Sequence, residues 1–332
     1  MSQAGRVTVA RSLLALALGT GVCYCVYRAL CTRGKKHVNG GGILDRVSGM
    51  TVRAGVNGGS PETKSENIPK PAGDLEAHHL QTLLHILSSC SHSSTQEQIL
   101  VTLCNSAAFS ANHDIIRNFN GIHIIGESLS HSNPRIKTGA LNALNNLSMN
   151  LQNQEQIQVF LIDILKDIKE STLNSEVQLA GLRLVVNMSV TDNYHEKLEE
   201  SIPSLLGLVD KGNNITKIHV LKILVNLSAN PLMTIPLLAS KAPASLIFLF
   251  DRNINRDVLI RVLTFAANLS ENLVREQQDN RPCSYKEDSL YGTLFEDPAV
   301  LQGTILQLLL FSDMEIKEQV NRCIRNVERL KH

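Results

Sequence analysis

One short pattern recurs along this chain and limits its fold more than any other feature: an apolar, Leu- and Ala-rich segment that ends in Asn. Examples are "LNALNNLSMN" from Leu141, "LVVNMSV" and "LVNLSANP". A unit of this kind cannot bury its apolar stripe alone, so repeated units are expected to stack. The final Asn residues of five such segments are Asn105, Asn146, Asn187, Asn226 and Asn268. They are 41, 41, 39 and 42 residues apart, and spacings of this size are typical of helical repeat arrays.

The residues between these segments also follow a repeated pattern. A short helical stretch such as "IHIIGESLS", "IPSLLGLVD" or "PASLIFLFD" is followed by a polar turn and then by the Asn-terminated helix. Trp is absent and aromatic residues make up only 4% of the chain, which favours aliphatic helix packing over a β-sandwich. The sequence therefore predicts an all-α solenoid of about six units in residues 74–332. A sixth copy ends in Asn326, 58 residues after Asn268, and we expect the polar stretch from Arg275 to form a surface loop that supplies the excess.

The amino-terminal region predicts a membrane anchor. An uncharged run extends from Ser12 to Tyr27 and can be extended to Cys31, which is short but sufficient for a thin bilayer. More basic residues follow this run than precede it, so the positive-inside rule places the rest of the chain in the cytosol. The expected organisation is a tail (1–11), a transmembrane signal anchor (12–31), a flexible linker (32–73) and the repeat domain (74–332). Cys31 is a candidate for palmitoylation.

Two other interpretations of this region stay open. The run could be a cleaved secretory signal, in which case the repeats would be luminal and the four Asn-x-Ser triplets would be acceptors for N-linked sugar. Alternatively, the protein could be a soluble nuclear or cytosolic scaffold whose apolar start is cleaved off or removed by splicing. The text after the run lacks a small-x-small cleavage site, which disfavours the first alternative. Hydropathy alone does not separate a mitochondrial from an endoplasmic reticulum membrane.

Charge is distributed unevenly along the chain. Residues 1–73 hold ten basic and three acidic residues, and the chain totals of 32 and 31 leave 22 basic and 28 acidic residues for the remainder. A net charge of −6 on residues 74–332 argues against nucleic acid as a partner of the repeat domain.

The repeats resemble those of armadillo proteins through "ALNALNNLSMN", "LRLVVNMSV", "LKILVNLSAN" and "VLTFAANLSEN". With its amino-terminal apolar run, the chain is similar to the armadillo repeat-containing X-linked (Alex) family. The resemblance implies an armadillo-repeat superhelix on the mitochondrial outer membrane, facing the cytosol, with a role in mitochondrial distribution and transport. It implies the Miro GTPases and the Trak kinesin adaptors as protein partners. The chain departs from nuclear-import armadillo proteins because it has no Trp to clamp a basic peptide.

In armadillo proteins the third helix of each unit lines a groove, and its Asn can bond the backbone of an extended peptide. Residues one and two turns before each Asn share its helix face. Because several of these residues are basic, we expect a locally basic strip suited to an acidic segment of a partner. The groove candidates are Asn105, Asn142, Asn146, Arg183, Asn187, His219, Lys222, Asn226, Arg261 and Asn268.

A competing interpretation assigns these residues no ligand. The basic residues would then be ordinary solvated helix charges, and the Asn side chains would bond the turn that follows each helix. In either case a folded helix hides the Asn-x-Ser triplets from glycosylation.

No sequence pattern indicates chemistry. The chain has no glycine-rich phosphate loop and no Gly-x-Ser-x-Gly, and its His and Cys residues lack a ligand spacing. We therefore expect a protein-binding adaptor, with no catalytic site, metal, cofactor or small-molecule substrate.

Overall fold

The computed structural model describes residues 77–278 and 285–330, and these residues form helices and no strand. One isolated antiparallel bridge joins Lys241 and Ser289. The expected tail, membrane anchor and linker, together with Cys31, lie outside the described residues. The structure therefore describes the expected repeat region, which separates into two compact units at residues 160 and 161.

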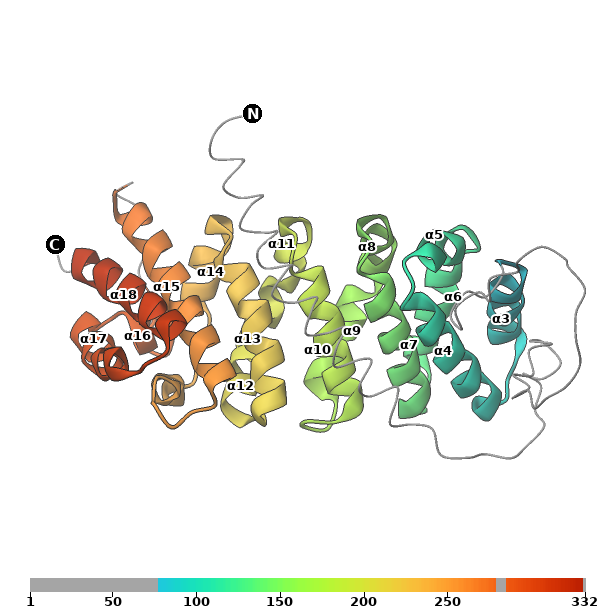
Figure 1. The fold of residues 1–332 in the computed structure, drawn as a ribbon, viewed down its shortest axis with the longest axis horizontal. Coiled ribbons are helices and arrows are strands. Elements are labelled where there is room, and N and C mark those ends of the chain that lie inside the picture. The colour runs from blue at the N-terminus through green and yellow to red at the C-terminus, as the bar shows by residue number, and fades with distance from the viewer. Residues whose placement is uncertain (1–76, 279–284, 331–332) are drawn as a thin grey trace, which may run out of the picture. The chain divides into compact units, whose positions relative to one another are not determined.

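In the unit that ends at residue 160, the packing centres on α4 and α7 (Figure 1). Leu100 and Leu103 of α4 and Leu141 and Leu144 of α7 are completely buried. The helices of this unit are α3 (Ala77–Ser89), α4 (Ser93–Ala107), α5 (Ala111–Asn118), α6 (Gly121–Glu127), α7 (Pro134–Leu147) and α8 (Leu151–Ile157), with 3-10 turns η1 (Ser128–Ser130) and η2 (Gln158–Phe160).

In the unit that begins at residue 161, α10, α13, α15 and α18 pack one against the next (Figure 1). Its α-helices are α9 (Leu161–Glu170), α10 (Glu176–Met188), α11 (His195–Leu198), α12 (Ile202–Lys211), α13 (Asn214–Ser228), α14 (Thr234–Ala239), α15 (Arg256–Gln278), α16 (Leu290–Leu294), α17 (Pro298–Leu306) and α18 (Met314–Leu330). Its 3-10 turns are η3 (Asp192–Tyr194), η4 (Glu199–Ser201), η5 (Pro231–Met233), η6 (Ala244–Leu249) and η7 (Gln307–Leu310).

The polar turns start the long helices by capping their first N–H groups. The side chain of Asn133 accepts a hydrogen bond from the Arg135 N–H, and that of Asn213 accepts one from the Thr216 N–H. Ser175 caps α10 in the same way. These side chains satisfy donors that have no partner inside the helix. The polar residues between the apolar segments therefore fix where each helix begins.

Asn174 adds a link between two successive helix starts. It adopts the left-handed conformation (φ 62°), which Asn tolerates better than most residues. Its Oδ1 accepts bonds of 2.9 Å from the Asn213 N–H and 2.8 Å from the Thr216 hydroxyl. This side chain ties the turn before α10 to the start of α13.

The predicted helix ends were partly wrong. The helices do not stop at the Asn residues: α7 and α10 continue one residue further, α4 and α13 two residues further, and α15 runs ten residues past Asn268 to Gln278. The segment "PASLIFLFD" was expected to form a short helix like the others, but it forms the 3-10 turn η6. The Pro at its start and the packing of Leu246 and Phe250 into the core favour this tighter turn.

The polar stretch from Arg275 was predicted to be a surface loop, and this is also partly wrong. Its first residues extend α15, and Leu290 starts α16. Between them, the Leu290 N–H donates to the Ser240 carbonyl at 2.8 Å, and the Ala242 N–H donates to the Asp288 carbonyl at 3.1 Å. Backbone pairing thus holds residues 288–290 against the segment before η6. The local composition of the chain could not predict this pairing.

Among the described helices, none alone has both the length and the apolar content needed to cross a membrane, and one sharply bent pair, Asn214–Ser228 with Pro231–Ala239, reaches them jointly.

Candidate partner-binding surface

The repeated Asn residues point toward the preceding long helix. The Nδ2 of Asn226 on α13 lies 3.0 Å from the Ser189 Oγ and 3.5 Å from the Val186 carbonyl oxygen, both at the end of α10. An amide NH2 group has two hydrogens, so two acceptors use its donor capacity. The Asn side chain therefore joins two consecutive units of the array.

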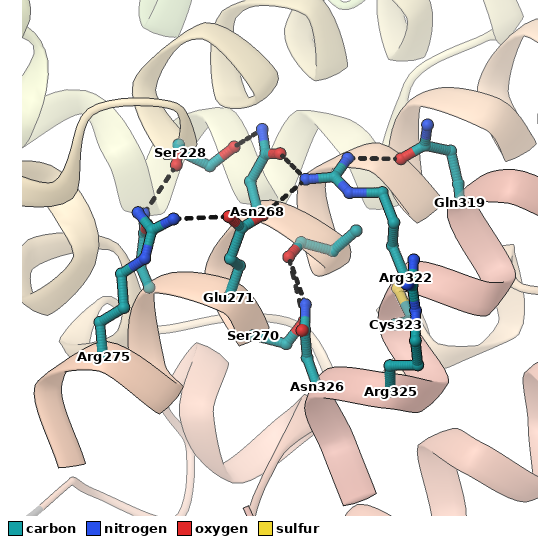
Figure 2. Close-up of polar contacts among 12 residues, drawn as sticks. Ser228, Asn268, Ser270, Glu271, Arg275, Gln319, Arg322, Cys323, Arg325 and Asn326 are labelled. Carbon is teal, nitrogen blue, oxygen red and sulfur yellow. Dashed lines mark hydrogen bonds and ion pairs between the residues drawn. The ribbon is translucent and has the colours of Figure 1, made fainter. Parts of the chain in front are cut away.

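The same contact recurs along the chain, and we call it the asparagine ladder. Asn268 bonds Ser228 Oγ at 3.1 Å and the Val225 carbonyl at 3.5 Å. Asn326 bonds Ser270 Oγ at 3.2 Å and the Ala267 carbonyl at 3.3 Å (Figure 2 shows the serine contacts). In the other unit, Asn146 bonds the Cys104 carbonyl at 2.9 Å.

The ladder explains why Ser so often follows Asn by two residues. The hydroxyls of Ser189, Ser228 and Ser270 accept from the Asn of the next long helix and donate to a carbonyl three residues earlier in their own helix. All three serines are completely buried. The Asn-x-Ser triplets are thus structural elements of the folded helices, and their buried serines are inaccessible in the folded domain.

Buried polar side chains complete the ends of the long helices. The Asn153 amide donates to the Leu147 carbonyl at 3.0 Å, and His195 Nε2 lies 2.8 Å from the Ser189 carbonyl. Asn272 donates to the Ser228 carbonyl at 3.0 Å. The last carbonyls of a helix have no partner inside the helix, so these side chains satisfy acceptors that would otherwise be buried unpaired.

The remaining Asn candidates lie on the long helices α4, α7 and α10. Asn105 is exposed near the end of α4, whereas Asn142 on α7 and Asn187 on α10 are half-buried. The prediction that the Asn side chains bond a ligand is restricted by the ladder, because Asn146, Asn226 and Asn268 already donate to protein acceptors. The Oδ1 atoms of Asn146 and Asn268 also accept bonds, from the Asn145 amide at 3.4 Å and from Arg322 at 3.2 Å.

The basic candidates lie on three successive long helices, α10, α13 and α15. We use the name basic strip for Arg183, His219, Lys222 and Arg261. Ladder bonds from Asn226 to α10 and from Asn268 to α13 fix the register of these helices. Arg183 lies four residues before Asn187, Lys222 and His219 lie four and seven residues before Asn226, and Arg261 lies seven residues before Asn268.

His219 lies at the centre of the basic strip. Burial, together with the charges of Lys222, Arg183 and Arg261, lowers the pKa of His219 to about 3. The imidazole is therefore neutral at physiological pH. Its Nδ1 is buried and has no hydrogen-bond partner among the described residues. The strip thus presents three permanent cations around one neutral, polar ring.

One carboxylate offsets part of this charge. Arg261 is paired with Asp257 at 3.1 Å, one turn earlier on α15. Arg261 remains partly exposed, with 24% of its side chain accessible. Arg261 is thus paired locally and still partly accessible to solvent.

The sequence analysis missed one member of this register, Arg322 on α18. It lies four residues before Asn326, as Lys222 lies four residues before Asn226, so the rule applied to the sixth copy would have found it. Arg322 is neutralised locally: its guanidinium bonds Asn268 Oδ1 at 3.2 Å, Glu271 at 2.9 Å and Gln319 at 2.7 Å (Figure 2). Glu271 also pairs with Arg275 at 2.6 Å.

The described residues contain no cluster of three or more His, Cys, Asp or Glu side chains that could hold a metal ion. Cys323 is buried beside the Leu263 carbonyl, and burial raises the pKa of its thiol to about 12. This thiol is therefore protonated and unreactive at neutral pH.

Several solved structures with a similar fold are engineered or designed proteins. An engineered protein with 18% identity matches with a TM-score of 0.60, over 76% of this chain and 97% of its own. A designed armadillo repeat protein, YIII(Dq)4CqI, matches with 14% identity and a TM-score of 0.61 over 75% and 99% of the two chains. Another, in complex with the peptide (KR)4, matches with 15% identity and a TM-score of 0.61 over 75% and 99%.

The sequence itself matches a known family. The pattern described as armadillo-like covers residues 75–294, which is more than half of the chain. The all-helical array and the recurring ladder contacts agree with this match. The chain therefore belongs to the armadillo-like family.

Proposed function

We propose that this protein is a membrane-tethered adaptor whose armadillo array binds an acidic segment of a protein partner. The observation that supports this most directly is the convergence of Arg183, Lys222 and Arg261 around His219. Cations gathered on one surface of an otherwise acidic domain attract and orient an anionic partner.

The sign of this charge distinguishes the proposed ligand from that of a structural relative. One designed armadillo repeat protein is in complex with the basic peptide (KR)4. The basic strip would repel such a peptide, since like charges facing each other across an interface are unfavourable. An armadillo array with this strip fits an acidic peptide in an extended or helical conformation.

The asparagine ladder accounts for the Asn-x-Ser triplets without glycosylation. Asn226 and Asn268 donate to the buried Ser189 and Ser228. These contacts give both the Asn amide and the Ser hydroxyl a structural role, so the triplets do not require a luminal location to explain them.

We further propose that residues 12–31 anchor the chain in the mitochondrial outer membrane and that residues 32–73 tether the array to it. The uncharged run with its basic flank supports this arrangement. By resemblance to the Alex family, the Miro GTPases and Trak kinesin adaptors are the first partners to test. Their capture at the membrane would affect mitochondrial distribution or transport.

Partner capture is tested by charge reversal in the full-length protein. We expect Arg183→Glu, Lys222→Glu and Arg261→Glu together to abolish co-precipitation of Miro and Trak and binding of a poly-glutamate peptide, with thermal stability retained. The matched control reverses Lys211, Lys217 and Arg325, which changes the net charge equally outside the strip. Undiminished capture by the strip variant would refute the proposed surface.

The location is tested by protease protection. Protease is added to intact mitochondria and to intact microsomes, and an epitope at the carboxyl terminus is followed. We expect the epitope to be lost from mitochondria. An epitope protected inside microsomes would instead establish a luminal domain and overturn the tethered adaptor.

A further inference from the structure

Helix α17 and the turn η7 that continues it form an apolar segment at the surface of the unit that begins at residue 161. The sequence from Pro298 to Ser312 has no charged residue. Helix α17 packs against α16 and α18 (Figure 1). Leu301, Ile305 and Leu308 are buried, and their spacing of four and three residues places them on one side of the segment. This side belongs to the core of the unit.

The opposite side of the segment is exposed and is also apolar. Val300 is 53% exposed, Leu306 45% and Leu310 89%, and Gly303 is exposed between them. We call Val300, Gly303, Leu306 and Leu310 the α17 face. A helix that is apolar on all sides is normally buried on all sides. A contiguous exposed apolar patch of this kind marks an interaction surface.

The neighbouring helix α18 shows how an exposed surface at the end of an array is otherwise built. Apart from Met314 at its start, the exposed side chains of α18 are polar or charged: Glu315, Glu318, Asn321, Arg325, Glu328 and Arg329. Polar outer faces of this kind keep the terminal repeats of an array soluble. The α17 face departs from this pattern, which indicates that another apolar surface covers it.

The α17 face is symmetric about Gly303. Val300 lies three residues before this glycine and Leu306 three residues after it. A Cβ atom at Gly303 would meet no other described atom within 4 Å, so a second backbone can approach closely at this point. If a second copy of α17 crosses there in the antiparallel direction, Val300 of each copy meets Leu306 of the other. Contacts that are equivalent in both directions are what a two-fold dimer requires.

The charges around the face also favour a second copy over a membrane surface. Glu296 and Asp297, directly before the apolar segment, are exposed. Helices that lie on membranes carry Lys and Arg, because the lipid surface is anionic. A second copy presents an uncharged face, and an antiparallel pair places the positive end of each helix dipole beside the negative end of the other.

The size of the face sets the strength of the contact. The apolar segment runs from Pro298 to Leu310, and one side of a single short helix is smaller than the roughly 800 Å² that each partner buries in a stable complex. A dimer formed through it alone is therefore weak and depends on concentration. Copies held on one membrane by the tether proposed above would meet at a higher effective concentration.

We propose that two copies of this protein associate through the α17 face as an antiparallel, two-fold dimer. The contact uses helices other than those of the basic strip, so each dimer presents two partner-binding surfaces. Two linked surfaces bind a partner that has two acidic segments more tightly than one surface does. The inference does not depend on what the basic strip binds, and its failure would leave the acidic-segment adaptor intact.

The first test is sedimentation of the full-length protein in detergent, with micelles in large excess over protein. We expect a shift from monomer to dimer as the protein concentration rises. Leu310→Arg should raise the dissociation constant at least about tenfold, because it places an unpaired charge in the contact. The control is Leu232→Arg on η5, where Leu232 is 84% exposed, and it should leave the constant unchanged. A wild-type protein that stays monomeric, or equal effects of the two variants, would overturn the proposal.

The second test examines the geometry with Gly303→Cys in the full-length protein. The two-fold axis places the two introduced thiols side by side, so mild oxidation should yield more covalent dimer than the wild-type cysteines do. Gly207→Cys on α12, where a Cβ atom also meets no described neighbour within 4 Å, should add none. A dimer that sediments as expected but does not cross-link through position 303 would refute the antiparallel pairing.

Other occupants of the face would give different results. In liposomes that hold less than one copy each, protection of the Gly303→Cys thiol from a water-soluble maleimide, with the Gly207→Cys thiol still labelled, would assign the face to lipid. Loss of Miro or Trak capture in Leu310→Arg, with a wild-type protein that is monomeric, would assign it to a different protein. Either result would refute the dimer.

Discussion

The long helices of residues 77–160 and those of residues 161–330 share one structural contact but differ in charge. Asn146 in the first region and Asn226 in the second both donate to the end of the preceding long helix. Four residues earlier, however, the first region has Asn142 and the second has Lys222. The ladder contact therefore maintains the stack in both regions, and the position one turn before it is where the surfaces diverge.

The ladder itself also differs between the regions. In the second region it uses buried Ser hydroxyls at the second position after Asn, whereas the first region has Ala107 there. Asn146 bonds the Cys104 carbonyl and lies 3.5 Å from its sulfur. A thiol is a weaker hydrogen-bond acceptor than a hydroxyl. We therefore expect the ladder to contribute more stability in the second region.

The largest expected effect tests this difference directly. Asn268→Ala removes bonds to Ser228, to the Val225 carbonyl and from Arg322, and we expect a loss of about 2–3 kcal/mol because buried partners are left unpaired. Asn146→Ala should cost only about 1 kcal/mol. Native-state hydrogen exchange of the amides in α13 and α15, and separately in α4 and α7, measures the two losses. An equal loss in both would contradict the comparison.

Acidification should weaken the second region through His219. Its folded-state pKa is about 3, below the unfolded value near 6.5, so the unfolded state binds more protons between these pH values. The free energy of unfolding is therefore hardly affected by His219 above pH 6.5, and it falls as the pH drops toward 3. We expect about 1–2 kcal/mol less stability at pH 5 than at pH 7 from this group. His219→Gln should reduce the difference in urea unfolding between these two pH values, and an unchanged difference would exclude His219 as its source.

The effect of a neutralising carboxylate on ligand binding can be tested at Glu271, in the carboxyl-terminal part of the second region. Glu271 pairs with both Arg322 and Arg275. Glu271→Gln should release these charges and strengthen poly-glutamate binding about two- to fivefold, as expected for a partly exposed ion pair. Glu318→Gln on α18 changes the net charge equally and is the control. Equal gains from the two variants would show that only net charge matters.

The smallest effects concern the ladder hydroxyl. Ser228→Ala should cost about 1 kcal/mol because Asn268 loses an acceptor. The reverse change in the first region, Ala107→Ser, supplies the hydroxyl that Asn146 lacks, and we expect its effect to stay within about 0.5 kcal/mol because one added bond offsets the cost of burying a polar group. Thermal unfolding of the two variants compares them. A cost from Ala107→Ser as large as that from Ser228→Ala would show that the first region does not accept the Ser-based contact.

The sequence by itself determined the repeat and its register. The spacing near 41 residues, the aliphatic composition and the polar turns are local features, and they were sufficient to predict an all-α solenoid, which the resemblance of its segments to armadillo repeats then assigned to a family. Helical periodicity also predicts that Arg183, Lys222 and Arg261 each share a face with the repeated Asn of their own helix, because residues one or two turns apart on a helix are neighbours. The contacts of each polar side chain, in contrast, could not be predicted from such local features.

Only the tertiary structure decided what those side chains contact. Asn226 reaches Ser189, 37 residues away, and Arg322 reaches Glu271, 51 residues away. Such pairs form when helices stack, and no periodic pattern in one helix specifies the partner on the next. The same is true of His219, whose lowered pKa arises from burial and from charges on three helices. Periodicity therefore specifies which face of a helix is shared, whereas packing determines which polar groups on that face remain available to a partner.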